Sequence, residues 1–241
     1  MATGLVSELI KRLGGSFARS LGIRLAGGAE PEIFKWFLAS FLYGARISTT
    51  IATRTYREFE NRGVVTPASI QKTGWTGLVQ ILDAGGYVRY DFSTATNLLA
   101  ISADLIERYG GKLGNVHAAA VDPRDLERRL MGIGKGIGPV TANIFLRELR
   151  GIWPKAQTAL SAPAALAARC LGLLSEKMGS GEQALEALQK QRRASRAPGS
   201  TFVDFEAALV RLGLGYCRKG KHDSCPLAAW CPTAGRARVR P

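Results

Sequence analysis

A glycine-dense turn between two helical patterns constrains the fold of this chain more than any other segment. Residues 132–142 read Gly-Ile-Gly-Lys-Gly-Ile-Gly-Pro-Val-Thr-Ala. A helix predicted over 124–131 precedes the turn, and the proline suits the first turn of a second helix, predicted over 139–150. Gly136 and Gly138 lack a Cβ, so they can adopt left-handed backbone and bring amides close to a ligand. Amides and a helix N-terminus together favour an anion.

Helical periodicity extends along nearly the whole chain. Apolar residues recur three or four positions apart in most segments, and no segment sustains the alternation of a half-buried strand. The chain is therefore predicted to be all-α. The expected helices cover residues 5–13, 33–42, 48–59, 66–73, 75–83, 124–131, 139–150, 163–171 and 202–212, and further helices begin near 93 and 182.

The balance of charge indicates a polyanionic partner. The chain has 33 Lys and Arg residues but only 19 Asp and Glu residues among its 241, which gives a formal net charge of +14. Counterion release from phosphates gives such a chain a strong, sequence-independent attraction to nucleic acid. The phosphates of a nucleic acid are therefore the expected anion at the glycine turn.

The hydropathy pattern gives no sign of a membrane or of export. No stretch approaches the roughly 20 apolar residues that span a bilayer, and the N-terminal segment is amphipathic with dispersed charges rather than a signal peptide. We expect no membrane partner and a cytoplasmic, nucleoid-associated protein. In a reducing compartment, the four cysteines are metal ligands or buried thiols rather than disulfides.

The glycine turn also suggests a family. The string from Gly136 to Leu146, Gly-Ile-Gly-Pro-Val-Thr-Ala-Asn-Ile-Phe-Leu, closely resembles the hairpin of the helix-hairpin-helix DNA glycosylases, the relatives of endonuclease III that act in base excision repair. The likeness extends over residues 33–231 and is strongest in the hairpin and the cysteine-rich tail. It implies a repair enzyme that flips a damaged or mismatched base out of double-stranded DNA and hydrolyses its N-glycosidic bond.

The resemblance implies a two-lobed all-α fold with a C-terminal metal or cluster loop, acting as a monomer. One lobe would comprise residues 31–150, and the other residues 1–30 with 151–241. The hairpin amides would hold the DNA backbone and read no sequence, while a loop of aromatic and basic residues would enter the stack beside the flipped base. The implied DNA contacts are Gly134, Lys135, Gly136, Gly138, Val140 and Thr141 in the hairpin, and Tyr87, Arg89 and Tyr90 in the loop.

The covalent route of the family is not supported by this sequence. Relatives that also cut the strand carry a lysine nucleophile two residues after the last glycine of the hairpin, and Val140 occupies that position. Without an amine no Schiff base can form there. The resemblance therefore implies a monofunctional glycosylase in which water is the nucleophile.

The family's catalytic aspartate follows a Trp-Pro pair, and the best-matching position after Trp153 and Pro154 is Gln157. Its amide is neutral and cannot act as a base. Three alternatives stay open. The carboxylate comes from Asp91 or Glu148, whose simpler roles are a helix cap and a surface charge; the chain binds damaged or structured DNA without catalysis; or the glutamine is an engineered inactivation.

The C-terminal cysteines suggest a metal site. Many endonuclease III relatives hold a [4Fe–4S] cluster with four cysteines here, and the spacing of Cys225 and Cys231 matches theirs. His222 occupies the second ligand position, and the gap after Cys217 is shorter than in the family. The implied ligands are these four residues, with a cluster first, zinc second and no metal third. Cys170, far from the tail, is interpreted as a small buried hydrophobe.

Overall fold

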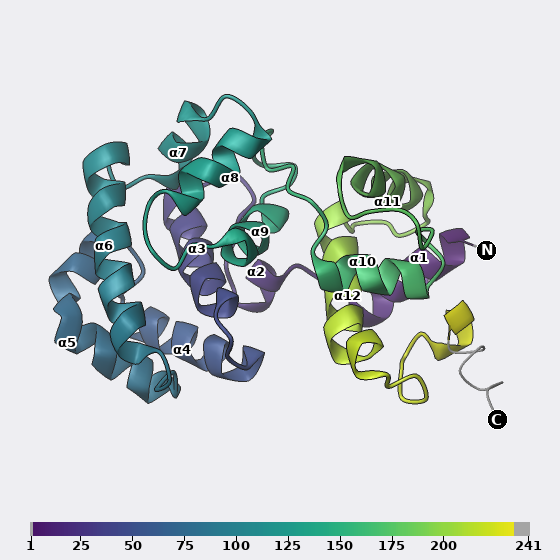
Figure 1. Cartoon of the computed structure of the whole chain (residues 1–241), viewed down its shortest axis with the longest axis horizontal. Helices are drawn as coiled ribbons and strands as arrows, with labels where there is room; N and C mark the ends of the chain where they lie inside the picture. The colour runs from purple at the N-terminus through teal and green to yellow at the C-terminus, as the bar shows by residue number, and fades with distance from the viewer. Residues whose placement is uncertain (1, 234–241) are drawn as a thin grey trace. The chain divides into compact units, whose positions relative to one another are not determined.

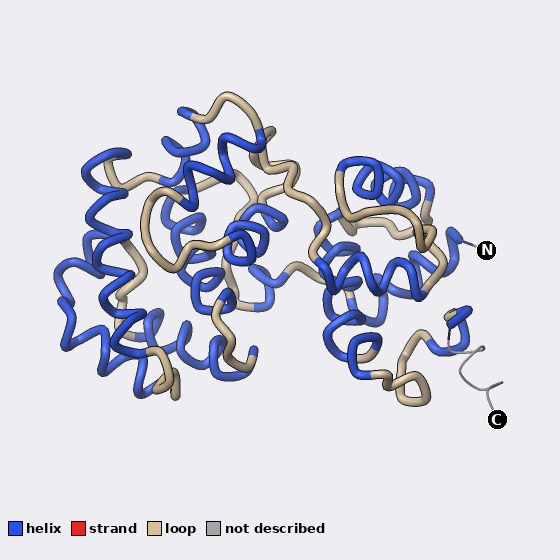
Figure 2. The backbone as a smooth tube through the Cα atoms, viewed as in Figure 1, coloured by secondary structure: helices blue, strands red, loops and turns tan. Residues whose placement is uncertain are grey.

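Helices and turns make up residues 2–233, the part of the chain that this computed structural model describes (Figure 1, Figure 2). No strand occurs in these residues, which confirms the all-α prediction. None of the helices in this range has the length and apolarity needed to cross a membrane. The α-helices are α1 (Ala2–Leu13), α2 (Phe17–Ser20), α3 (Glu30–Gly44), α4 (Thr49–Asn61), α5 (Pro67–Gly85), α6 (Asp91–Tyr109), α7 (Leu113–Ala119), α8 (Pro123–Met131), α9 (Pro139–Glu148), α10 (Ala162–Cys170), α11 (Glu182–Ala194) and α12 (Phe202–Gly215); the short 3-10 helices are η1 (Cys217–Lys219) and η2 (Ala228–Trp230).

The helices divide into two compact units. The central unit comprises Leu21–Thr158 and contains α3 to α9. The terminal unit combines the N-terminal segment up to Ser20 with the chain from Ala159 onward, and contains α1, α2 and α10 to α12. The central unit is thus inserted between two segments that pack with each other.

The central unit is longer at both ends than the lobe expected from the sequence. Residues 21–30 and 151–158 belong to it rather than to the terminal unit. The carbonyl of Leu21 accepts a hydrogen bond from Arg57 on α4, and the buried ring of Trp153 packs on α9. The contact between Leu21 and Arg57 joins residues 36 positions apart, so the local sequence around that boundary does not reveal it.

Helix α3 forms the core of the central unit. Most of its side chains are buried, from Ile33 to Leu42. The indole N–H of Trp36 donates to the Phe145 carbonyl of α9 at 3.1 Å, and the ring of Phe37 meets the Phe145 ring edge-on at 5.5 Å. Buried aromatic side chains contribute about 1.5–3 kcal/mol each, so this contact fixes α9 firmly on α3.

Helix α5 contains the break that its sequence predicts. Gly74 has φ 67° and interrupts the helical backbone, at the place where one helix was expected to end and the next to begin. A capping box between Thr66 and Ser69 starts the first part. The second part ends at Gly86, which adopts the left-handed conformation. The break redirects the chain so that both parts bury their apolar faces.

In the terminal unit, Arg211 of α12 holds the end of α1. Its guanidinium donates to the carbonyls of Leu13, Gly14 and Gly15 at 2.9, 3.3 and 2.5 Å, and it lies over the ring of Phe17 at 4.1 Å. These carbonyls belong to the unsatisfied C-terminal end of a helix. The arginine therefore acts as a long-range C-terminal cap.

The close approach of α12 to α10 gives a stability prediction. A Cβ on Gly213 would overlap the carbonyl oxygen of Pro163, whereas a Cβ on Gly215 in the same helix would meet nothing within 4 Å. We expect Gly213→Ala to lower the free energy of unfolding by about 1–3 kcal/mol. Gly215→Ala is the matched control, expected to leave it unchanged or raise it by up to about 1 kcal/mol. Urea denaturation of both variants measures the difference; equal effects would contradict the packing.

Candidate nucleic-acid interface and cysteine-lined cavity

The turn between α8 and α9, residues 132–138, is the glycine hairpin predicted from the sequence. Gly136 has φ 96°, a conformation that favours glycine. A Cβ there would also lie 3.0 Å from the ring of Phe41, and one on Gly134 would lie 2.7 Å from the side chain of Ile101. The hairpin is thus packed against α3 and α6, and its glycines allow that approach.

The N-terminus of α9 presents backbone amides without a side-chain cap. Gly138 is the N-cap and forms no side-chain cap hydrogen bond, and Pro139 follows it. The first helical bond joins the Ala142 amide to the Gly138 carbonyl at 3.0 Å. The amides of Val140 and Thr141 therefore precede the helical hydrogen-bond ladder. An anion is favoured at such a helix terminus.

The predicted hairpin contacts differ in exposure. Lys135 is exposed and forms no ion pair with any acidic side chain in residues 2–233. Val140, in the first turn of α9, is 62% exposed. Thr141 is 3% exposed, because its side chain packs against Gly44 of α3. Thr141 can therefore contribute its amide to a ligand but not its hydroxyl.

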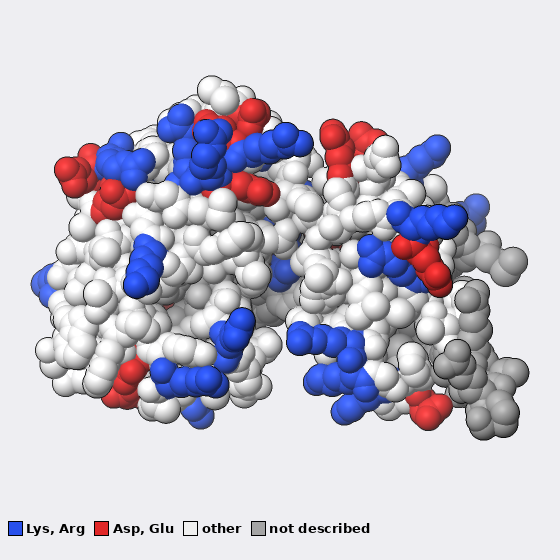
Figure 3. Space-filling view, in the orientation of Figure 1, with Lys and Arg blue, Asp and Glu red and all other residues white. Residues whose placement is uncertain are grey.

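The basic side chains of α8 are partly neutralised. They gather on the surface with acidic side chains among them (Figure 3). Asp125 pairs with Arg129 at 2.7 Å and with Arg128 at 3.1 Å, and the Arg129 guanidinium lowers the pKa of Asp125. The carboxylate also accepts the Val121 amide. These contacts stabilise the helix that leads into the hairpin and leave less of its charge for phosphate.

The loop before α6 corrects one predicted contact. Tyr87 was expected to enter the DNA stack, but it is 1% exposed and its hydroxyl donates to the Leu42 carbonyl at 3.0 Å. Tyr87 is therefore a core residue. Arg89 is exposed and lies over the half-buried Tyr90 ring at 5.3 Å. The most exposed apolar groups nearby are Val88 and Phe92, which no sequence pattern singled out.

The Trp-Pro turn is anchored by aromatic stacking. Trp153 stacks on the imidazole of His117 from α7, with centroids 4.8 Å apart and planes 14° apart. Its other contact is edge-on to Phe145 at 5.6 Å. Lys155 donates to the His117 carbonyl at 2.9 Å. Burial, aided by the charge of Lys155, lowers the pKa of His117.

The segment that carries Gln157 is held by a buried arginine. Arg150 donates to the carbonyl of Ala156 at 3.3 Å and to that of Thr158 at 2.6 Å, one on each side of Gln157. The Thr158 hydroxyl accepts from the Asn143 amide at 3.1 Å. Gln157 itself is exposed. Its backbone position is therefore fixed while its side chain faces solvent.

The alternative carboxylates lie in different settings. Asp91 is the first residue of α6, where it accepts the Phe92 amide at 2.7 Å. The N-cap is Tyr90, so α6 begins before the expected start near 93. Glu148 ends α9 and is 3% exposed, so it is not the surface charge that the sequence suggested.

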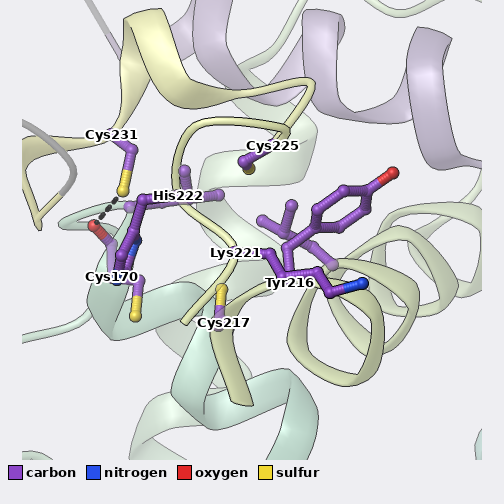
Figure 4. A pocket seen from close by; sticks show the side chains of 9 residues that line it. Cys170, Tyr216, Cys217, Lys221, His222, Cys225 and Cys231 are labelled. Atoms are coloured by element: carbon purple, nitrogen blue, oxygen red, sulfur yellow. Dashed lines mark hydrogen bonds between the residues drawn. The ribbon is translucent and has the colours of Figure 1, made fainter. Parts of the chain in front are cut away.

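All the cysteines of the chain line one small cavity in the terminal unit. Cys217 and Cys225 come from the tail after α12, Cys231 follows η2, and Cys170 ends α10. His222 also lines the cavity (Figure 4). Each cysteine is half-buried and none forms a disulfide. The tail residues expected to be ligands thus come together, and Cys170, interpreted as a small core residue, joins them.

The cavity environment disfavours free thiolates. Burial raises the pKa of Cys217 to about 12, and the neighbouring Cys170 adds to the rise. Burial also raises the pKa of Cys170 and of Cys225. Within residues 2–233 no three His, Cys, Asp or Glu side chains are already gathered as a ready-made coordination site. The donors share one cavity, but their side chains would have to turn toward a common metal.

No protein-family model matches this chain, and no curated protein matches it either. Its function is therefore inferred from its own residues.

The lowered pKa of His117 gives a pH prediction. Because the pKa of His117 in the folded protein lies below its ordinary value of about 6.5, the unfolded chain binds the proton more tightly. The contribution of neutral His117 to stability is therefore fully present above about pH 6.5 and is lost as the pH falls through the pKa of the folded protein. We expect His117→Phe, which keeps an aromatic ring on Trp153, to lose less stability than the wild type between about pH 7 and pH 5. Urea denaturation at the two values measures this; equal losses in both proteins would refute it.

Proposed function

We propose that the chain is a DNA-repair glycosylase with a helix-hairpin-helix fold, which binds double-stranded DNA as a monomer, flips out a damaged or mismatched base and hydrolyses its N-glycosidic bond. The observation that carries the proposal is the uncapped N-terminus of α9 behind the glycine hairpin, with Lys135 exposed beside it. That arrangement suits a backbone phosphate, and the net charge of +14 suits a long polyanion.

The phosphate would be bound by amides and by charge. The amides of Val140 and Thr141 can donate to its oxygens, and the helix terminus favours it by about 0.3–1 kcal/mol. Lys135 adds a direct ionic contact and releases a counterion. None of these groups reads a base, so the hairpin holds DNA of any sequence.

Side chains of the loop before α6 and of its first turn would insert into the base stack. Arg89 is exposed there, and Val88 and Phe92 are 64% and 59% exposed. Apolar side chains inserted between base steps unstack them, which lowers the cost of flipping a base. These residues replace Tyr87 in that role, because Tyr87 is buried.

The chemistry would proceed through water. Val140 has no amine, so no Schiff base to the sugar can form at that position. Water would attack the anomeric carbon while the bond to the base breaks. The water loses a proton to the solvent, and the base, which leaves with the electron pair, takes up a proton from the solvent. Gln157 could orient that water through its amide, but it could not accept its proton.

A second candidate is a DNA-binding protein without catalysis. The observation that favours it is the neutral side-chain amide of Gln157, at the position in the sequence where the resemblance implies a carboxylate. Such a protein would use the same hairpin to recognise damaged or structured DNA.

The proposed phosphate site at the N-terminus of α9 can be tested by a substitution that stabilises the protein but weakens DNA binding. Gly138 has φ −93°, and a Cβ added to it would meet no other atom within 4 Å. Gly138→Asp would supply the missing cap and raise the free energy of unfolding by a few tenths of a kcal/mol, but its charge would repel the phosphate. We expect about tenfold weaker duplex binding, equivalent to about 1.4 kcal/mol, measured by fluorescence anisotropy at fixed salt.

Gly138→Ser is the matched control, since it caps the helix without a charge. It should bind DNA more tightly than the aspartate variant. Unchanged binding by Gly138→Asp, with the fold intact, would exclude a phosphate at this terminus.

Catalysis is tested with duplexes that carry uracil, a thymine mismatch, an oxidised base, an alkylated base or an abasic site. We expect base release from at least one lesion, no strand cutting and no adduct trapped by borohydride. Gln157→Asp, which supplies a carboxylate, should release the base faster, while Gln183→Asp, at an exposed position of α11, should not change the rate. Binding without release from any duplex, by wild type and Gln157→Asp alike, would support the non-catalytic candidate; a trapped adduct would overturn the water mechanism.

A further inference from the structure

The cysteine-lined cavity unites segments that are distant in sequence. Cys170 ends α10, whereas Cys217, Cys225 and Cys231 lie in the tail more than forty residues later. The sequence holds four cysteines and all of them line this cavity (Figure 4). Chance burial of small hydrophobes does not explain why every thiol of the chain is found at one place.

Direct contacts join Cys170 to the tail. The Cys231 thiol donates to the Cys170 carbonyl at 3.2 Å, and the Thr233 hydroxyl donates to the same oxygen at 3.1 Å. The Cys170 and Cys217 side chains are also hydrogen-bond neighbours. The tail is therefore held against the last turn of α10, with the thiol of Cys170 among the other three.

His222 has a different relation to the cavity. Its amide donates to the Gly220 carbonyl at 2.9 Å, and its own carbonyl accepts the Cys225 amide at 3.2 Å. The backbone of His222 thus forms part of the turn that leads to Cys225. This role does not require its imidazole as a ligand.

We propose that Cys170, Cys217, Cys225 and Cys231 bind one thiophilic metal centre, a zinc ion or an iron–sulfur cluster, and that Cys170 rather than His222 is its fourth ligand. Four sulfur donors are the set that both centres use. Each thiol would release its proton on ligation, and the side chains would turn inward from their present positions. The proposal does not depend on the DNA-binding function, because its residues lie in the terminal unit and the hairpin lies in the central unit.

The surroundings fit a charged centre of this kind. Four thiolates around a divalent ion carry a net charge of −2, and Lys221 lines the same cavity. The cavity volume is about 10 Å³, room for a group the size of one water. That volume suits a single ion, whereas a cluster also needs the thiols to move apart.

The test is the metal content of the full chain, purified without oxygen and reconstituted separately with zinc and with iron plus sulfide. We expect the wild type to retain one of the two centres after desalting, and elemental analysis distinguishes zinc from iron. Cys170→Ser should lose the retained metal, and His222→Gln should keep it. Loss in His222→Gln with retention in Cys170→Ser, or a wild type that retains neither metal, would overturn the proposal.

A measurement on the wild type covers the case in which Cys170→Ser fails to fold. Thiols are alkylated before and after metal removal by a chelator, and each labelled cysteine is identified by mass spectrometry. We expect Cys170 to be protected in the metal-loaded protein and to become reactive together with the other three. Labelling of Cys170 at the same rate in both states would show that it is not a ligand. DNA binding is measured on the same samples, so that a failure of the proposed metal site can be distinguished from a failure of the proposed DNA binding.

Discussion

A chain of aromatic contacts supports the part of the central unit that the proposed function uses. It runs from Phe37 on α3 to Phe145 on α9, then to Trp153 and to His117 on α7, with centroid separations of 5.5, 5.6 and 4.8 Å. Each such pair contributes about 0.5–1.5 kcal/mol beyond the area it buries. The same contacts fix the helix whose N-terminus faces the hairpin and the turn that leads to Gln157. The orientation of both therefore depends on one packed core.

Only some of the basic side chains in the central unit are available to bind a ligand. The chain carries a net charge of +14, but Arg128 and Arg129 are paired with Asp125 within α8, and the buried Arg150 donates to backbone carbonyls. Lys135 is free of such ion pairs in the described chain. A count of basic residues predicts attraction to a polyanion, but only the structure distinguishes charges that serve the fold from those left for a ligand.

Local signals were enough to predict most of the helices and several of their ends, although α2 and α7 were not expected. The break at Gly74 and the starts after the N-cap residues Thr66 and Asp122 follow from residues within one turn. Contacts between distant segments could not be predicted in this way. The burial of Tyr87 depends on a carbonyl 45 residues away, and the place of Cys170 beside the tail depends on how α10 packs on α12. No pattern in a single sequence indicates that these distant residues are in contact.

The hydrogen bonds from Arg211 to the C-terminal end of α1 also affect the order in which the protein can fold. The central unit has all of its residues in one continuous segment, so it can fold as soon as that segment has been synthesised. Helix α1 is made before α12, yet its buried residues Leu5, Val6 and Leu9 pack in a core completed by α12. At roughly 5–20 residues per second, α1 waits on the order of 10–40 s for that partner. During this interval the apolar face of α1 is open to chaperones and to other nascent chains, so α1 reaches its native position only after the whole central unit has been made.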